Sequence, residues 1–122
     1  MAWELDSDRP IYTQLVEKLE LAVLTGRFPP GGRLPSVRDL AAEAGVNPNT
    51  MQRALSQLEQ EALVSTQRTA GRTVTEDAAL IARIRLHLAR SRTAAWRRAM
   101  AELGYGTEEL PKLLETEWKE GT

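Results

Sequence analysis

The chain has 122 residues, enough for one small domain and an extension, and its composition of 42% hydrophobic and 27% charged residues is typical of a globular protein. The absence of cysteine excludes disulfides and thiolate metal sites, and no apolar run approaches the length of a membrane span. A formal net charge of −1 does not point to nucleic acid, so the placement of the charges carries the argument.

The first helix is expected to begin after Pro10. The leader before it is acidic and lacks the apolar segment of a signal peptide, which favours a cytoplasmic location. Apolar residues then recur at helical spacing from Ile11 to Val23, and Gly26 ends the run. The segment 28–32 is rich in Pro and Gly and predicts a loop, followed by a very short strand.

Residues 34–58 predict two short helices joined by a tight turn. Ser36 is a natural N-cap for the first helix, and Gly45 provides a turn position that accepts a positive φ. Asn47 followed by proline is a typical start for the second helix, which we expect to end near Ala62. This is the pattern of a helix-turn-helix, whose second helix enters the DNA major groove.

A hairpin is predicted next, with strands at 64–67 and 72–75 and a turn at 68–71. Three helices followed by a hairpin is the order of a winged helix-turn-helix. We therefore predict a mainly α protein in which residues 1–75 form a DNA-binding domain with a small two-stranded wing.

Residues 76–122 predict a short two-helix dimerisation region. A long helical pattern without Gly or Pro runs as far as Gly104, and Thr107 is expected to cap a last helix that tolerates Pro111 in its first turn. The apolar stripe of the long helix exceeds what a small winged domain can bury, which favours a homodimer. The predicted dimer interface comprises Leu80, Ile81, Ile84, Leu88, Ala95, Trp96, Ala99, Leu103, Leu110, Leu114 and Trp118.

Five motifs stand out in the first 64 residues. They are Pro10-Ile-Tyr-Thr-Gln14, Gly26-Arg-Phe-Pro-Pro-Gly31, Leu34-Pro-Ser-Val-Arg38, Val46-Asn-Pro-Asn-Thr50 and Leu58-Glu-Gln-Glu-Ala-Leu-Val64. Together they make the chain resemble the GntR family of transcription factors, in particular its YtrA-like branch, closely over residues 10–75. The chain departs from the family pattern in the hairpin, where Thr69 replaces a Gly and Thr73 an aromatic residue. Ala62 stands where a Gly commonly ends the recognition helix.

The resemblance implies a repressor that binds an inverted-repeat operator in double-stranded DNA as a homodimer. It also implies that the short C-terminal part serves dimerisation, because the larger effector-binding domain of other branches has no room in 122 residues. A small-molecule effector remains open, since no residue pattern demands one. No cofactor and no membrane partner are expected.

The residues predicted to contact DNA are polar or basic and lie in the helix-turn-helix and the hairpin. Asn and Gln pair with adenine edges, Thr meets a thymine methyl or a phosphate, and Arg grips phosphate or guanine. The resemblance also assigns Arg38 to a DNA-contacting position. Each residue has a simpler interpretation as a solvated surface group, or as a helix cap for Ser36 and Asn47. The set is Arg33, Ser36, Arg38, Asn47, Asn49, Thr50, Gln52, Arg53, Arg68 and Arg72.

Catalysis and metal binding find little support in the sequence. His87 is the single histidine and there is no cysteine, so no catalytic triad or metal-ligand cluster emerges and we expect no enzyme. The alternative function is a winged helix that binds another protein without specific DNA binding. Among the aromatic residues, Trp3 and Tyr12 are expected to pack together, and Trp96 and Trp118 to fill the dimer core.

Overall fold

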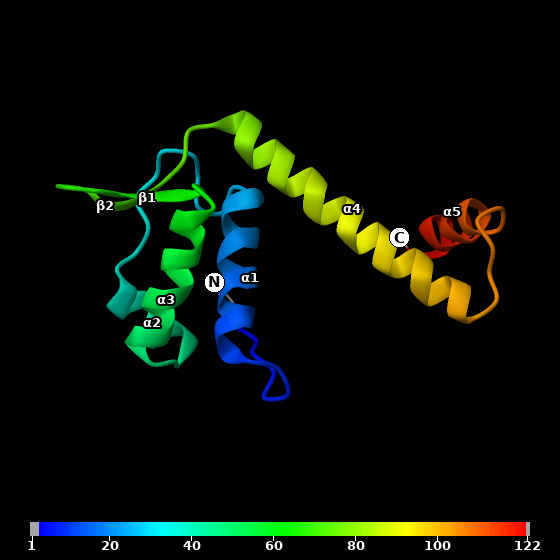
Figure 1. Ribbon diagram of the computed structural model, residues 1–122, viewed down its shortest axis with the longest axis horizontal. Helices are drawn as coiled ribbons and strands as arrows, with labels where there is room; N and C mark the ends of the chain where they lie inside the picture. Colours follow the sequence, from blue (N-terminus) through cyan, green and yellow to red (C-terminus); the bar gives the residue numbers. More distant parts are fainter. Residues whose placement is uncertain (1–2, 122) are drawn as a thin grey trace. The chain divides into compact units, whose positions relative to one another are not determined.

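The computed structural model describes residues 3–121, within which the chain forms five α-helices and one two-stranded antiparallel sheet (Figure 1). The elements are α1 (Ile11–Leu24), α2 (Val37–Ala44), α3 (Pro48–Gln60), β1 (Val64–Gln67), β2 (Gly71–Val74), α4 (Ala78–Glu102) and α5 (Leu110–Gly121). The predicted mainly α fold with a small wing is confirmed. The chain divides into two compact units between Ile84 and Arg85, so α4 begins in the first unit and ends in the second.

The core of the first unit is aliphatic and lies between α1, α2 and α3. Helices α1 and α3 run side by side, and α2 packs against α3 (Figure 1). Their inward faces carry side chains that are completely buried, and burying each of them contributes roughly 1.5–3 kcal/mol. These are Leu15 and Leu19 of α1, Leu40 of α2, and Met51, Leu55 and Leu58 of α3. The helical spacing of these residues therefore fixes which face of α3 remains outside.

The helix-turn-helix is capped as its sequence predicts. The Ser36 hydroxyl oxygen accepts a hydrogen bond from the Asp39 amide at 3.1 Å, and the Asn47 side-chain oxygen accepts one from the Asn49 amide at 2.7 Å. Between the two helices Gly45 has a φ of 69°, in the left-handed region that glycine adopts without strain. The start of α3 is thus fixed by contacts that span only three residues.

Helix α3 ends at Gln60, two residues before the predicted end near Ala62. Ala62 adopts a positive φ of 64°, and its amide donates to the carbonyl of Glu59 at 3.0 Å. The amide of Leu63 donates to the carbonyl of Leu58 at 3.0 Å. These two hydrogen bonds together form a Schellman motif, which ends the helix and leads the chain into β1.

The wing pairs β1 with β2 from Val64 opposite Val74 to Gln67 opposite Gly71. Strand β2 begins and ends one residue earlier than the predicted 72–75, because Gly71, at a φ of 73°, both closes the turn and pairs with Gln67. The short strand expected before α2 is present as a single bridge between Arg33 and Thr73.

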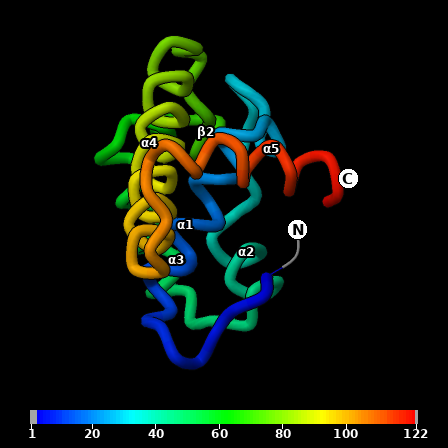
Figure 2. The backbone as a smooth tube through the Cα atoms, turned by 90° about the vertical axis from the view of Figure 1, so that its right-hand side faces the viewer, coloured from blue at the N-terminus to red at the C-terminus, as the bar shows by residue number. Residues whose placement is uncertain are grey.

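The chain before α1 forms an arm that loops below the first turn of this helix (Figure 2). Gln14, which is only 3% exposed, holds the arm by its side-chain amide. Its oxygen accepts from the amide of Asp6 at 2.6 Å, and its nitrogen donates to the carbonyls of Asp6 and Arg9 at 2.7 and 3.0 Å. Arg9 also pairs with Glu17 at 2.6 Å. The arm is therefore an ordered part of the first unit.

In the second unit α4 is continuous through residues 91–93. The prediction that Thr107 caps the last helix is wrong, since residues 107–109 form a turn and α5 begins at Leu110. Pro111 explains the difference. If Thr107 were the cap, residue 111 would have to donate the first helical hydrogen bond, and proline has no N–H. Leu113 instead makes that bond to the carbonyl of Glu109 at 3.1 Å.

Candidate nucleic-acid interface

The outer face of α3 is polar and exposed. Asn49, Gln52 and Arg53 lie on it, opposite the buried side chains of Met51 and Ala54. This face results directly from helical periodicity, because the apolar positions are used by the core and leave the polar ones outside. Amide and guanidinium groups on an exposed helix face are suited to reading base edges in a major groove.

The first turn of α3 carries two further predicted residues. Asn47 is exposed, and its side-chain oxygen serves as the cap, while the amide nitrogen makes no hydrogen bond within residues 3–121. Capping and base contact are therefore compatible in Asn47. Thr50 differs from the outer-face residues, since it is half-buried and lines a hollow that Trp3 and Ile11 also line. Trp3 lies beside this hollow, and its packing against Tyr12 stays a prediction.

Helix α2 contributes Ser36 and Arg38 at its first turn. The Ser36 hydroxyl is engaged as the cap, and its oxygen accepts a backbone hydrogen bond. The Arg38 side chain is exposed. Arg38 therefore has the freedom that a DNA contact requires, whereas the observed role of Ser36 is structural.

Two of the predicted arginines belong to the wing and a third, Arg33, lies beside it. Arg68 is exposed in the turn, and Arg33 lies beside the same turn, where a Cβ added to Gly71 would stand 3.7 Å from the Arg33 Nε atom. Arg72 is different, because its Nε donates to the Glu59 carboxylate of α3 at 2.6 Å and only 17% of its side chain is exposed. Sequence reasoning grouped Arg72 with the DNA contacts, but the structure gives it a partner within the chain.

Glu59 is a residue that sequence reasoning missed. Its carboxylate accepts from Arg72 and also from the Thr66 hydroxyl at 2.9 Å, so it joins the last turn of α3 to both strands of the wing. Burial pushes the pKa of Glu59 upward, but the hydrogen bonds from Arg72 and Thr66 outweigh burial and lower this pKa below its ordinary value. Glu59 is therefore ionised at neutral pH and fixes the wing relative to α3.

Tyr12 is the second residue missed. The Arg53 guanidinium lies over its ring, with 4.7 Å between the Cζ atom and the ring centroid. The sequence contains no local signal for this contact, because Tyr12 belongs to α1 and Arg53 to α3.

The charges on this surface favour an anionic partner. Within residues 3–121, no ion pair joins Arg33, Arg38, Arg53 or Arg68 to an acidic side chain. The same part of the chain contains no group of three His, Cys, Asp or Glu residues arranged to hold a metal ion. None of its helices has the length and hydrophobicity needed to cross a membrane.

The residues predicted for a dimer interface fall into three groups. Ile81 and Leu110 are buried within the chain itself. The half-buried group is Leu80, Ile84, Leu88 and Trp96, and the exposed group is Ala95, Ala99, Leu103, Leu114 and Trp118. Two large apolar side chains further along α5 are strongly exposed, Leu114 with 54% and Trp118 with 72%.

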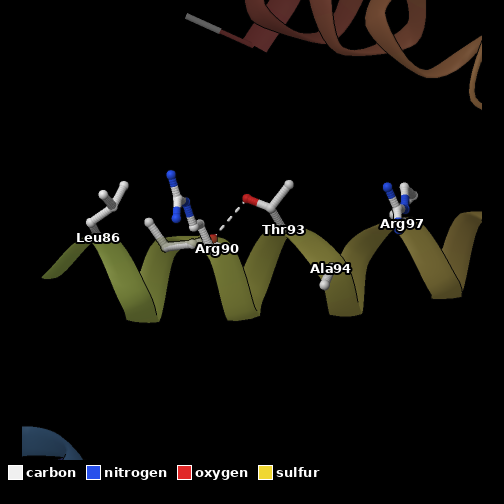
Figure 3. Close-up of a pocket in the computed structure, with 6 residues that line it drawn as sticks. Leu86, Arg90, Thr93, Ala94 and Arg97 are labelled. Atoms are coloured by element: carbon white, nitrogen blue, oxygen red, sulfur yellow. Dashed lines mark hydrogen bonds between the residues drawn. The ribbon is translucent and has the colours of Figure 1, made fainter. Parts of the chain in front are cut away.

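Helix α4 carries a second exposed strip, in which Arg90 and Arg97 belong to the arginines that the sequence predicts on a solvated face of this helix. Leu86, Arg90, Thr93 and Arg97 project from one side of α4, around a shallow hollow (Figure 3). Leu86 is 51% exposed. The second unit therefore leaves apolar surface uncovered on both of its helices.

Comparisons with known proteins agree with this arrangement. The sequence model of a family described as "Bacterial regulatory proteins, gntR family" matches residues 11–74. Over 113 residues the chain is 33% identical to the uncharacterized HTH-type transcriptional regulator YhcF of Bacillus subtilis, covering 93% of each protein. Over 72 residues it is 40% identical to the HTH-type transcriptional repressor YtrA of Bacillus subtilis, covering 59% of this chain and 55% of that protein. A solved GntR family transcriptional regulator from Listeria monocytogenes is similar with a TM-score of 0.86 and 33% identity, over 92% of this chain and 98% of that one.

Proposed function

Because the chain belongs to the GntR family of bacterial regulatory proteins, we propose that it binds an inverted-repeat DNA operator as a homodimer and represses the promoter that it covers. The family consists of DNA-binding transcriptional regulators rather than enzymes. The homodimer, the inverted repeat and repression are the steps that the proposal adds.

The observation that carries the proposal is the exposed polar face of α3, flanked by arginines without acidic partners among the described residues. Asn49 and Gln52 offer paired donor and acceptor groups for adenine, which give sequence discrimination. Arg38 on α2 and Arg68 on the wing stand on separate elements beside α3 and are suited to the DNA backbone. Specific readout and backbone attraction are thus both available on one unit.

Two arguments support a homodimer. One recognition helix contacts only a few base pairs, whereas selecting a site from a genome needs several kcal/mol of discrimination, and two symmetric copies roughly double the readout. In addition, the exposed apolar residues of α4 and α5 need a cover, and a second copy of the same surface supplies one. The residues that we assign to this contact are exposed Leu114 and Trp118 of α5 with Ala95 and Ala99 of α4.

Repression is supported by the similarity of the chain to a repressor and by the length of DNA that a dimer would cover. The relative YtrA is named a transcriptional repressor. A dimer that occupies two half-sites one helical turn apart blocks polymerase from the same DNA, without any further domain. The alternative function, a winged helix that binds another protein, differs from DNA binding because it does not depend on the amides and arginines around α3.

The test is selection of bound fragments from genomic DNA by the full chain. We expect enriched fragments that share an inverted repeat, with half-sites about one helical turn apart. A chain that enriches no sequence, or only a single asymmetric half-site, would contradict the proposal.

Substitution of Arg38 by alanine then distinguishes a contact with a base from a contact with a phosphate. If it reads a base, Arg38→Ala weakens operator binding by about 1–3 kcal/mol and relaxes preference at one position. A uniform loss across sequences marks a phosphate contact. Binding equal to the parent protein would remove Arg38 from the interface.

A further inference from the structure

The contact between Tyr12 and Arg53 has a geometry that serves DNA binding. Tyr12 is the second residue of α1 and is half-buried, while Arg53 lies on α3 and is exposed. The guanidinium carbon stands 4.7 Å from the centroid of the ring, within the range in which the face of an aromatic ring attracts a cation.

The ring contact leaves the Arg53 guanidinium without a carboxylate or carbonyl partner. Within residues 3–121 no hydrogen bond or ion pair engages any of its five N–H donors, which are therefore available to a ligand. Arg72 provides the contrast within this protein, because its Nε donates in the plane to Glu59 at 2.6 Å. Among the described residues, Arg72 therefore has an acidic partner, whereas Arg53 on α3 has none.

The position of Arg53 on α3 indicates which part of the DNA its N–H donors contact. It lies one helical turn after Asn49 on the exposed face, on the flank that Tyr12 of α1 supports. Residues at the start of a recognition helix meet base edges, whereas groups at its flanks face the phosphates that border the groove.

We propose that Tyr12 is a positioning residue that holds the Arg53 guanidinium in place for a DNA phosphate. This inference rests on the proposed function, since it assumes that α3 enters a groove. An arginine side chain loses much rotamer freedom when it binds, and a stack formed beforehand removes part of that loss. The interaction of a partly exposed cation with a ring corresponds to a difference of about two- to fivefold in affinity for each subunit.

The experiment compares Tyr12→Phe and Tyr12→Leu in operator binding by the full chain, each in the parent and in an Arg53→Gln background. Phenylalanine keeps the ring, so Tyr12→Phe should bind like the parent. Tyr12→Leu keeps an apolar side chain at this half-buried position but removes the ring, and should weaken binding by about two- to fivefold per subunit on all sequences alike. In the Arg53→Gln background, Tyr12→Leu should have no further effect. Arg53→Gln should itself reduce the slope of log affinity against log salt by about one per subunit.

Three results would overturn the proposal in a protein that binds its operator. One is equal weakening by Tyr12→Phe and Tyr12→Leu, which would mark a direct contact of the hydroxyl. Another is the same loss from Tyr12→Leu with and without Arg53. The third is a loss confined to one base position, which would make Arg53 a base reader.

A measurement without DNA separates this proposal from the proposed function. In the free protein, the Arg53 side-chain methylene protons should be shifted upfield in the NMR spectrum by the current of the Tyr12 ring. The shift should persist in Tyr12→Phe and vanish in Tyr12→Leu. Its absence from the parent protein would refute the stack whatever the DNA result, whereas failure of the parent protein to select DNA would refute the proposed function.

Discussion

Among the described residues, Ala62 is the one non-glycine residue with a positive φ, at 64°. The left-handed region costs alanine about 1–2 kcal/mol because its Cβ crowds the following carbonyl. Glycine escapes this strain but loses about 0.4–1 kcal/mol through the greater freedom of its unfolded chain. The Schellman motif that ends α3 therefore carries strain at one defined residue.

We predict that Ala62→Gly raises the free energy of unfolding by about 0.5–1 kcal/mol, measured by urea denaturation. The matched control is Ala42→Gly, at an exposed position inside α2. That substitution should lower stability by about 1 kcal/mol, as is usual in a helix interior. Destabilisation by both variants would show that Ala62 does not hold its left-handed conformation in solution.

Glu20 of α1 introduces a pH dependence near neutrality. Burial raises its pKa to about 7, with a smaller part from a hydrogen bond to Glu61 and from the charges of Glu61 and Glu17. Because the folded pKa lies above the unfolded value, the stability that protonated Glu20 provides is complete at low pH. It is lost as the pH rises through about 7.

We therefore predict that Glu20→Gln flattens the pH dependence of unfolding between pH 5 and pH 8. A glutamine side chain is neutral at every pH, whereas the acid is neutral only at low pH. The gain at pH 8 should be of the order of 1 kcal/mol once the partial solvent exposure of Glu20 is allowed for. The exposed Glu43→Gln serves as a control that should leave the profile unchanged. Parallel profiles for Glu20→Gln and the parent would contradict the assignment.

At the scale of elements, the Glu59–Arg72 pair joins the wing to α3. We predict that Glu59→Gln and Arg72→Gln each lower the free energy of unfolding by about 1 kcal/mol, and that the double variant loses little more than either one. Arg68→Gln in the turn should cost almost nothing, since Arg68 has no ion pair among the described residues. Additive losses would show that Glu59 and Arg72 do not interact.

The stability that the Glu59–Arg72 pair provides changes with pH in the opposite direction to the stability that Glu20 provides. Hydrogen bonds lower the pKa of Glu59 despite burial, so its contribution is present above the ordinary carboxyl pKa and is lost as the pH falls through the lowered value. The difference in stability between the parent and Glu59→Gln should thus disappear in acid.

Local features were predictable because both partners lie close together in the chain. The caps at Ser36 and Asn47 span two or three residues, and the sequence shows donor and acceptor side by side. The pairing of Arg72 with Glu59 spans 13 positions and depends on how the wing folds back on α3. The stack on Tyr12 depends on the packing of α1 against α3. The presence of an arginine in the sequence therefore does not indicate whether its guanidinium has a partner within the folded chain.

At the scale of the whole molecule, the exposed apolar residues of α5 are the ones that we assign to the proposed dimer contact. We predict that Leu114→Asp converts the proposed dimer to a monomer in sedimentation velocity, because the new carboxylate would be buried without a partner. The cost is several kcal/mol, which raises the dimer dissociation constant by more than about a hundredfold. Operator affinity should fall with it.

The control for this prediction places the same charge on another face of the same helix. Thr116 is exposed, and Thr116→Asp should leave both the dimer and DNA binding intact. If the parent chain sediments as a monomer at concentrations at which it binds its operator, the dimer is refuted.

The arm held by Gln14 has a practical consequence for laboratory work on this protein. Trp3 and Leu5 line the hollow at the turn between α2 and α3, together with Asn47. A purification tag attached a few residues before Trp3 would therefore be tethered close to the start of α3, where a polyhistidine peptide can obstruct or artificially attract nucleic acid. Removing the tag with a protease before binding assays avoids this source of false results.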